Sequence, residues 1–293
     1  MTAVPPLLKP RQRAPQQPRS RVDALRFVTF LAPNLVWFYE FLSQYLGREL
    51  DCDAQLTVGS SYDELATADV AFVCSLPYIE LAQRGDCPVA PIAAPVLEGP
   101  RYGGRPIYFS DVIVRHDSPW RSFADLRGRS WAYNEPHSQS GYGITRQFLL
   151  QCGETRGYFG KVVEAGWHER SVRMVCAGEV DASAVDSHVL AVMMRDEPEL
   201  AARVRVIYAL GPSTIQPVVA ARRLPERVKS ALRRALLALA DDPDVKGILA
   251  RALIERFVPV RDSNYNDIRR MLLAAQRAEF MSISTNQSTS ATP

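Results

Sequence analysis

The chain has 293 residues, of which 47% are apolar and 23% charged, a composition typical of a folded globular protein large enough for two lobes. Its net charge of +3 comes from residues 1–22, which carry five basic residues and no acid, so the body lacks a basic surface for nucleic acid. No apolar run reaches the ~20 residues that cross a bilayer, and the N-terminus lacks the apolar core of a secretory signal peptide. We therefore expect no nucleic-acid partner and no membrane span.

The two ends of the chain differ from the body in composition. Residues 1–22 are rich in Pro, Gln and Arg without a hydrophobic period, and residues 281–293 are rich in Ser and Thr. Both are predicted to be disordered tails.

The body alternates strand and helix patterns. Strands are predicted at 25–30, 56–58, 69–73, 89–96, 108–114, 130–133, 180–185, 204–208 and 215–220. Helices are predicted between Asn34 and Gly47, at 62–67, 75–83, 123–128 and 144–150, between Gly166 and Gly178, and at 187–195, 226–240, 243–254 and 264–280. This alternation predicts an α/β protein of parallel sheets with helices on both faces.

The stretch 134–142 stands out because two serines lie where a helix should begin. Pro136 separates a short strand from this helix, and Ser138, Ser140 and Gly141 follow. Hydroxyls and unpaired backbone N–H groups at a helix start make a natural site for a small oxyanion. The alternative is that Ser138 or Ser140 serves only as an N-cap.

Several other polar or aromatic residues directly follow predicted strands. Tyr78, Asp186 and Gln216 do so, and His168 lies just ahead of a helix. Because loops at the carboxyl ends of such strands gather in one crevice, we expect these residues to converge with Ser138 and Ser140.

Sequence motifs for other chemistries are absent. There is no phosphate-binding GxxxxGK[ST], no GxGxxG after the first strand, no nucleophile elbow and no HExxH. Five cysteines without CxxC spacing and four scattered histidines give no metal-ligand pattern. We expect no metal, no cofactor and no nucleophile–base pair.

Six segments together resemble the substrate-binding proteins of phosphate, phosphite and phosphonate ABC transporters. They occur in family order and cover about residues 23–280; they are 25–34, 69–78, 134–141, 166–169, 178–187 and 211–219. The resemblance implies a type 2 periplasmic-binding-protein fold with the ligand in the cleft between two lobes. Lobe one would comprise 23–110 and 212–280, and lobe two 111–211.

The resemblance also implies ligand-binding residues. In the family, the Ser-x-Ser segment and a histidine hold the phosphorus group, and aromatic residues close the other side; here these positions are Ser138, Gln139, Ser140, His168, Tyr39 and Tyr78. The alternatives are core packing for the two tyrosines and plain helix capping for His168 and Asp186.

Two further positions bear on the ligand. Family members that bind an aminoalkyl phosphonate place acids against the amine, whereas this chain has His188 and Gln216 there. The resemblance therefore argues against an aminophosphonate. Asp186 could accept a hydrogen bond from a protonated ligand oxygen but would repel a fully ionised one, which favours a monoprotonated anion.

The leading hypothesis is a monomeric, non-enzymatic binding protein for a small oxyanion that serves an ABC permease. The sequence as given predicts a cytoplasmic protein, whereas family analogy or a misassigned start predicts a periplasmic one. The alternatives are a cytoplasmic enzyme on the same fold, with His168 as acid or base, or a ligand sensor.

Overall fold

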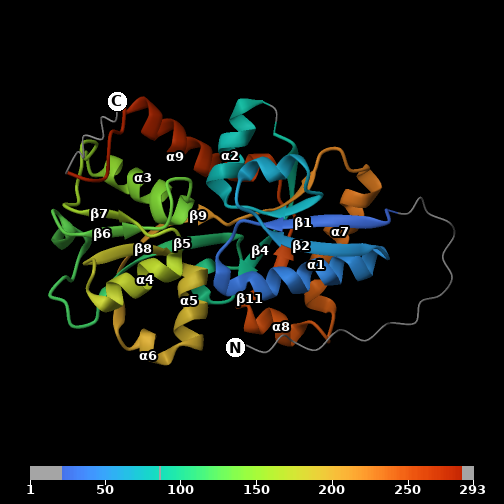
Figure 1. Ribbon diagram of the computed structural model, residues 1–293, viewed down its shortest axis with the longest axis horizontal. Coiled ribbons are helices and arrows are strands. Elements are labelled where there is room, and N and C mark those ends of the chain that lie inside the picture. The colour runs from blue at the N-terminus through green and yellow to red at the C-terminus, as the bar shows by residue number, and fades with distance from the viewer. Residues whose placement is uncertain (1–21, 86, 286–293) are drawn as a thin grey trace.

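The computed structural model describes residues 22–85 and 87–285. The predicted basic tail at 1–22 therefore lies outside the described residues, except for Val22. The described residues form two sheets that lie side by side, with helices packed above and below them (Figure 1).

The first sheet has six strands in the order β11-β4-β10-β3-β1-β2. The strands are β1 (Ala24–Thr29), β2 (Asp53–Val58), β3 (Val70–Phe72), β4 (Val89–Leu97), β10 (Val218–Ala221) and β11 (Ile254–Val258).

The second sheet has five strands in the order β7-β6-β8-β5-β9. The strands are β5 (Ile107–Arg115), β6 (Trp131–Tyr133), β7 (Val162–Glu164), β8 (Ala182–Asp186) and β9 (Val204–Thr214).

The helices of the described residues connect these strands. They are α1 (Val36–Leu50), α2 (Ser75–Arg84), α3 (Ile144–Gln151), α4 (His168–Ala177), α5 (Ser187–Asp196), α6 (Pro198–Ala201), α7 (Glu226–Leu237), α8 (Lys246–Arg251) and α9 (Asn266–Arg277). None of these helices is both long and apolar enough to span a bilayer, as far as the described residues go.

The prediction of parallel sheets is wrong in part, because both sheets are mixed. β1 pairs with β2 and β3 in parallel, but β10 runs antiparallel to both β3 and β4. In the second sheet β6 is parallel to β7 and β8, whereas β5 is antiparallel to β8 and β9. β5 is the first strand after the chain crosses to the second sheet, and β10 is the first after it returns. Each crossing strand therefore enters its new sheet against the direction of its neighbours.

The two crossings divide the chain into lobes. The first lies between β4 and β5, and the second between β9 and β10. The boundaries expected near 110 and 212 fall inside β5 and β9, which belong to the second sheet over their whole length. The C-terminal helix α9 packs on α2 from one lobe and on α3 from the other (Figure 1).

The region after residue 243 contains a strand where only helix was expected. The predicted helix at 243–254 is the short α8 followed by β11, which pairs antiparallel with β4. Ile254 and Phe257 of β11 are buried against the first sheet. β11 thus overlaps the predicted helix only at Ile254, and its other four residues form a strand, by pairing with the edge of β4, where no element was predicted.

The first residues of the predicted C-terminal tail are ordered, which corrects the expectation of disorder there. Ile283 is 2% exposed, and its carbonyl accepts hydrogen bonds from the backbone N–H groups of Tyr158 and Phe159. Ser284 forms a parallel bridge with Phe159. Residues 281–285 thus cover the aromatic cluster in which Phe159 stacks on Trp131, with ring centroids 4.2 Å apart. Residues 286–293 lie outside the described residues.

We predict that Ile283→Ala lowers the free energy of unfolding by roughly 2–5 kcal/mol, because it leaves a cavity beside Phe159. Urea unfolding measures this change. Met281→Ala is the control, since Met281 is 62% exposed two residues away. Equal stability of the two variants would contradict the packing described for this segment.

Candidate functional site

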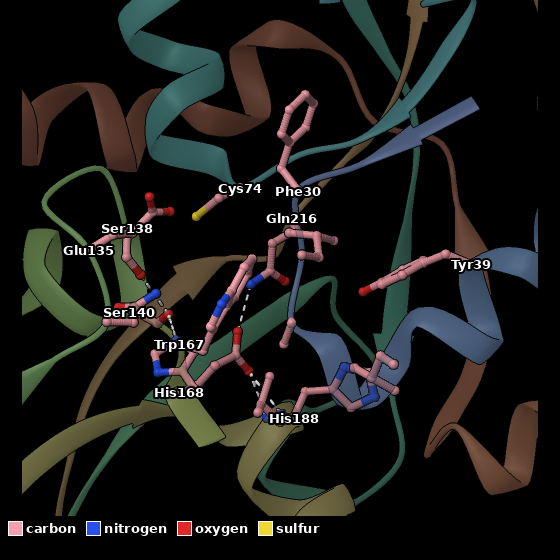
Figure 2. A pocket seen from close by; sticks show the side chains of 16 residues that line it. Phe30, Tyr39, Cys74, Glu135, Ser138, Ser140, Trp167, His168, His188 and Gln216 are labelled. Atoms are coloured by element: carbon pink, nitrogen blue, oxygen red, sulfur yellow. Dashed lines mark hydrogen bonds between the residues drawn. The ribbon is translucent and has the colours of Figure 1, made fainter. Parts of the chain in front are cut away.

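A small pocket lies between the two lobes and receives side chains from both (Figure 2). Its volume is about 40 Å³, more than the roughly 10–15 Å³ that one water molecule needs. The lining residues are Phe30, Leu31, Ala32, Leu35, Tyr39, Cys74, Asn134, Glu135, Ser138, Ser140, Trp167, His168, Asp186, His188, Val189 and Gln216.

Within the described residues, five helical segments begin at this pocket. Each contributes its N-cap residue to the lining; these are Ala32 before η1 (Pro33–Leu35) and α1, Cys74 before α2, Ser138 before η5 (Gln139–Gly143) and α3, Trp167 before α4, and Asp186 before α5. Every helix start presents the positive end of its dipole. Some of the first N–H groups are already capped: those of His188 and Val189 donate to Asp186, and that of Gly141 donates to Ser138. The pocket is therefore electropositive in its backbone.

The charged side chains at the pocket have the opposite sign. Glu135 and Asp186 line it, and no Lys or Arg does so among the described residues. A bound anion would thus be held by dipoles and neutral donors, with two carboxyl groups nearby. This balance favours an anion of low charge.

The serine loop enters its helix through a π-helical turn. Ser138 caps this turn, and its Oγ accepts a hydrogen bond from the Gly141 N–H at 3.1 Å. A Cβ at Gly141 would lie 1.9 Å from Oδ1 of Asn134, so any larger residue there would have to displace the Asn134 side chain. The wide turn brings Ser138 and Ser140 to the same wall of the pocket (Figure 2).

His168 is linked to this wall by a hydrogen bond. Its Nε2 lies 2.8 Å from Oγ of Ser140, and the two serine oxygens are 3.3 Å apart. Burial lowers the pKa of His168 to about 3, so the imidazole is neutral near pH 7. Ser140 and His168 are thus within hydrogen-bonding distance although the sequence separates them by 28 residues.

The hydrogen-bond partners of the two His168 ring nitrogens indicate which of them carries the proton. Nδ1 of His168 has no partner within the described part of the protein. A buried N–H without an acceptor is rarer than a buried acceptor without a donor, so the proton belongs on Nε2. His168 then donates to Ser140. That direction leaves the Ser140 hydroxyl hydrogen available to the pocket.

Asp186 combines capping with pocket lining. Its Oδ1 caps α5 by accepting from the N–H groups of His188 and Val189, and its Oδ2 accepts from Nε2 of Gln216 at 2.6 Å. Gln216 lies on the crossing between β9 and β10, so this bond joins the second sheet to the hinge. Burial raises the pKa of Asp186 to about 6 despite these donors. The carboxylate is therefore held in a site that disfavours its charge.

Tyr39 approaches the pocket from α1, on the side opposite Ser138 and Ser140 (Figure 2). Its ring stacks on Phe72, with centroids 4.7 Å apart, and its hydroxyl points into the pocket. Burial, followed by the charge of Asp186, raises the pKa of Tyr39 above its ordinary value. The hydroxyl is thus a permanent proton donor.

Two of the predicted site residues do not line the pocket. Tyr78 is fully buried, and its hydroxyl donates to Asp262 at 2.8 Å. The side chain of Gln139 points toward Ser213 and Met271, with Nε2 3.3 Å from Oγ of Ser213. Both residues support the walls around the pocket. Tyr78 does so within lobe one, through its bond to Asp262. Gln139, in the turn before α3, contacts β9 through Ser213 and α9 through Met271.

Glu135, Cys74 and Trp167 line the pocket but were not predicted as site residues. Glu135 accepts a hydrogen bond from Tyr62 of the other lobe at 3.2 Å, and burial raises the pKa of this carboxyl group. Cys74 and Trp167 immediately precede α2 and α4. Cys74 and Trp167 each lie between a strand and the helix that they cap, and this position in the sequence could have identified them.

The described residues contain no group of three or more His, Cys, Asp or Glu side chains that could hold a metal ion. The functional groups that line the pocket are hydroxyls, amides, two imidazoles, two carboxyl groups, a thiol and backbone N–H groups.

A family model matches most of the chain. The model for the periplasmic substrate-binding protein of phosphonate ABC transporters covers residues 29–265. The chain belongs to this family. The resemblance inferred from the six sequence segments is thereby confirmed.

Individual relatives are more distant. The phosphonates-binding periplasmic protein of Escherichia coli (strain K12) is 25% identical over 175 residues, which are 58% of this chain and 52% of that protein. The match thus spans about half the length of this curated relative.

Solved structures of phosphonate-binding proteins share the fold. The binding protein component of an ABC phosphonate transporter from Pseudomonas aeruginosa gives a TM-score of 0.75 at 19% identity, covering 92% of this chain and 91% of that one. PhnD1 from Prochlorococcus marinus in complex with methylphosphonate gives 0.76 at 17% identity, covering 88% and 99%. The predicted two-lobed type 2 periplasmic-binding-protein fold is confirmed.

We predict that His168 stays neutral, with its proton on Nε2, between about pH 8 and pH 5, because burial disfavours the imidazolium. Nitrogen-15 NMR of histidine-labelled protein distinguishes the tautomers, and the His168→Gln variant assigns the signal. A proton on Nδ1, or titration within this range, would contradict the hydrogen-bond direction derived above.

We predict that Asp186→Asn makes the protein more stable than wild type at pH 7.5, by up to about 3 kcal/mol. The raised pKa means that protonated Asp186 stabilises the fold; this contribution is complete below the unfolded pKa and is lost as pH rises through about 6. Urea unfolding at pH 4 and pH 7.5 tests the sign. The idea fails if wild type gains stability over the variant as pH rises.

Proposed function

We propose that this protein binds a small phosphorus oxyanion between its lobes and delivers it to an ABC permease. The ligand class is phosphonate, phosphite or phosphate. Membership of the phosphonate-binding family supports the transport role. The match of the fold to a methylphosphonate complex supports the size and chemistry of the ligand.

The observation that carries this proposal is the meeting of five helix starts with two serine hydroxyls at one pocket. Such an arrangement stabilises a negative charge through backbone N–H groups and dipoles. Ser138 and Ser140 would donate to ligand oxygens, with Ser140 oriented by His168. Tyr39 would donate from the opposite lobe.

The charge of the ligand follows from the acids at the pocket. Asp186 and Glu135 would both repel a dianion, whereas a monoprotonated oxyanion can donate its own proton to one of them. We therefore expect the monoanion to be the bound form. His188 and Gln216 offer no charge to an ammonium group, so Asp186 and Glu135 are the pocket residues that could face one.

Binding and release would follow the closure of the lobes about the two crossings. Tyr62 with Glu135, and Glu80 with His137 at 2.8 Å, form hydrogen bonds across the lobes. A single chain contributes the whole pocket, so we propose a monomer that acts without covalent chemistry. By analogy with its family, it would work in the periplasm.

An enzymatic role is the second candidate, because Ser140 and His168 are paired. No group orients Nδ1 of His168 in the described residues, so the third member of a catalytic triad is missing there. Phosphorus-31 NMR of the protein with its ligand distinguishes the two roles. Turnover that disappears in His168→Ala would favour the enzyme.

We predict that isothermal titration calorimetry detects binding of phosphite or methylphosphonate, and that Ser140→Ala weakens it by about 10- to 100-fold through loss of a charged hydrogen bond. Ser43→Ala is the matched control, since Ser43 is equally buried but bonds to its own helix, at the carbonyl of Glu40. Absence of millimolar or tighter binding to phosphite, methylphosphonate, phosphate and sulfate would refute the proposed function.

A further inference from the structure

Tyr78 and Gln139 lie beside the pocket without lining it, and each is next to a helix start that does line it. Tyr78 is in the first turn of α2, which begins after Cys74, and Gln139 directly follows Ser138. The backbone N–H of Gln139 donates to Sγ of Cys74 at 3.5 Å. The start of α2 in one lobe and the serine turn in the other therefore meet at the pocket.

Tyr78 connects the start of α2 to the C-terminal helix α9. Its hydroxyl donates to Oδ1 of Asp262 at 2.8 Å, and Nη2 of Arg269 donates to both carboxylate oxygens of Asp262, at 3.0 and 3.1 Å. Asp262 begins η7 (Asp262–Tyr265), the turn before α9, whereas Arg269 lies within α9. Burial, followed by the bond to Asp262, raises the pKa of Tyr78, so its hydroxyl remains a donor at neutral pH.

Gln139 connects the serine turn to the same helix. Its Nε2 lies 3.2 Å from Sδ of Met271 in α9 and 3.3 Å from Oγ of Ser213 in β9. The side chain of Gln139 is 1% exposed, so water does not compete for these contacts. They hold the backbone between Ser138 and Ser140 against α9 and β9.

The helix between these two connections is itself fixed to both lobes. α9 packs on α2 and on α3 (Figure 1). Its first turn is also bound to the end of β9, because Oδ2 of Asp267 accepts a hydrogen bond from the backbone N–H of Thr214 at 2.7 Å. A hydrogen-bonded helix is stiff over this length, so contacts along it hold their partners at a set spacing.

We propose that α9 sets the spacing of the start of α2 and the serine turn, and so positions the Ser138 and Ser140 hydroxyls for the ligand. Tyr78, Asp262 and Arg269 form its connection to lobe one, and Gln139 forms its connection to lobe two. They are positioning residues, because their side chains do not line the pocket. The inference rests on the proposed function and assigns the groups that shape its site.

The Tyr78 hydroxyl gives the sharpest test, because Tyr78→Phe removes only the bond between α2 and Asp262. Calorimetric titration with methylphosphonate is expected to show an affinity about 3- to 10-fold below wild type, the range for one hydrogen bond. Tyr265→Phe is the matched control and should bind like wild type. Tyr265 is equally buried, its ring centroid is 5.7 Å from that of Tyr78, and its hydroxyl has no partner within the described residues.

A second pair of variants tests the bond between Asp262 and α9. Arg269→Gln removes this ion pair and is expected to weaken methylphosphonate binding by a similar factor. Arg270→Gln is the control, since Arg270 is the next residue along α9 and is exposed. The double variant Tyr78→Phe, Arg269→Gln should lose less affinity than the two single losses multiplied, because both act through one carboxylate. If Tyr78→Phe does not fold, the Arg269 and Arg270 variants decide.

The nitrogen-15 signal of His168 reports on the serine turn without any ligand, because its Nε2 lies 2.8 Å from Oγ of Ser140. Gln139→Met keeps the length of the side chain but removes the donor that holds the turn. We expect this variant and Tyr78→Phe to shift the signal, and Tyr265→Phe to leave it in place. A role in folding alone would lower the free energy of unfolding and change neither the signal nor the affinity.

The outcomes separate this inference from the proposed function. Wild-type affinity and an unshifted His168 signal in folded Tyr78→Phe, Arg269→Gln and Gln139→Met overturn the role of α9 and leave oxyanion binding intact. Equal losses in the control variants overturn it as well. If neither phosphite nor methylphosphonate binds, the proposed function fails, and the His168 signal alone decides whether α9 positions the serine turn.

Discussion

The structure depends on bringing five helix starts to one point between two sheets. Helices α1, α2, α3, α4 and α5 each follow a strand, and each presents its first turn to the same pocket. Together they direct the positive ends of their dipoles at the pocket, where no Lys or Arg contributes to the lining so far as the described residues show. Burial nevertheless raises the pKa of Asp186 and of Glu135, so the dipoles do not cancel the cost of burying these two carboxyl groups. The fold that brings these helix starts together therefore also determines the electrostatic environment of the pocket.

Much of the fold could be predicted because its elements have strong local patterns. The strand at 25–30 and the helix that follows it, for example, match β1 and α1 closely. The direction of β5 and β10 could not be predicted, because it is set by how the chain crosses between lobes. β11 was missed because its five residues gain stability only by pairing with β4. The order of residues 281–285 likewise comes from distant Phe159.

The site was predicted where local chemistry determines position. Ser138 and Ser140 follow a strand and a turn, and His168 begins a helix, so their convergence could be inferred from topology. Tyr78 was misplaced because its partner, Asp262, is 184 residues away in the chain. The side chain of Gln139 points toward Ser213 of β9 and Met271 of α9 and does not line the pocket. Neither contact leaves a signal in the local sequence.

The most direct test is a crystal structure of the protein with methylphosphonate. We predict that the phosphonate oxygens lie within hydrogen-bonding distance of the Ser138 and Ser140 hydroxyls and of backbone N–H groups at the starts of α2, α3 and α4, and that no Lys or Arg contacts them. A ligand held by a basic side chain, or bound away from these helix starts, would contradict the account.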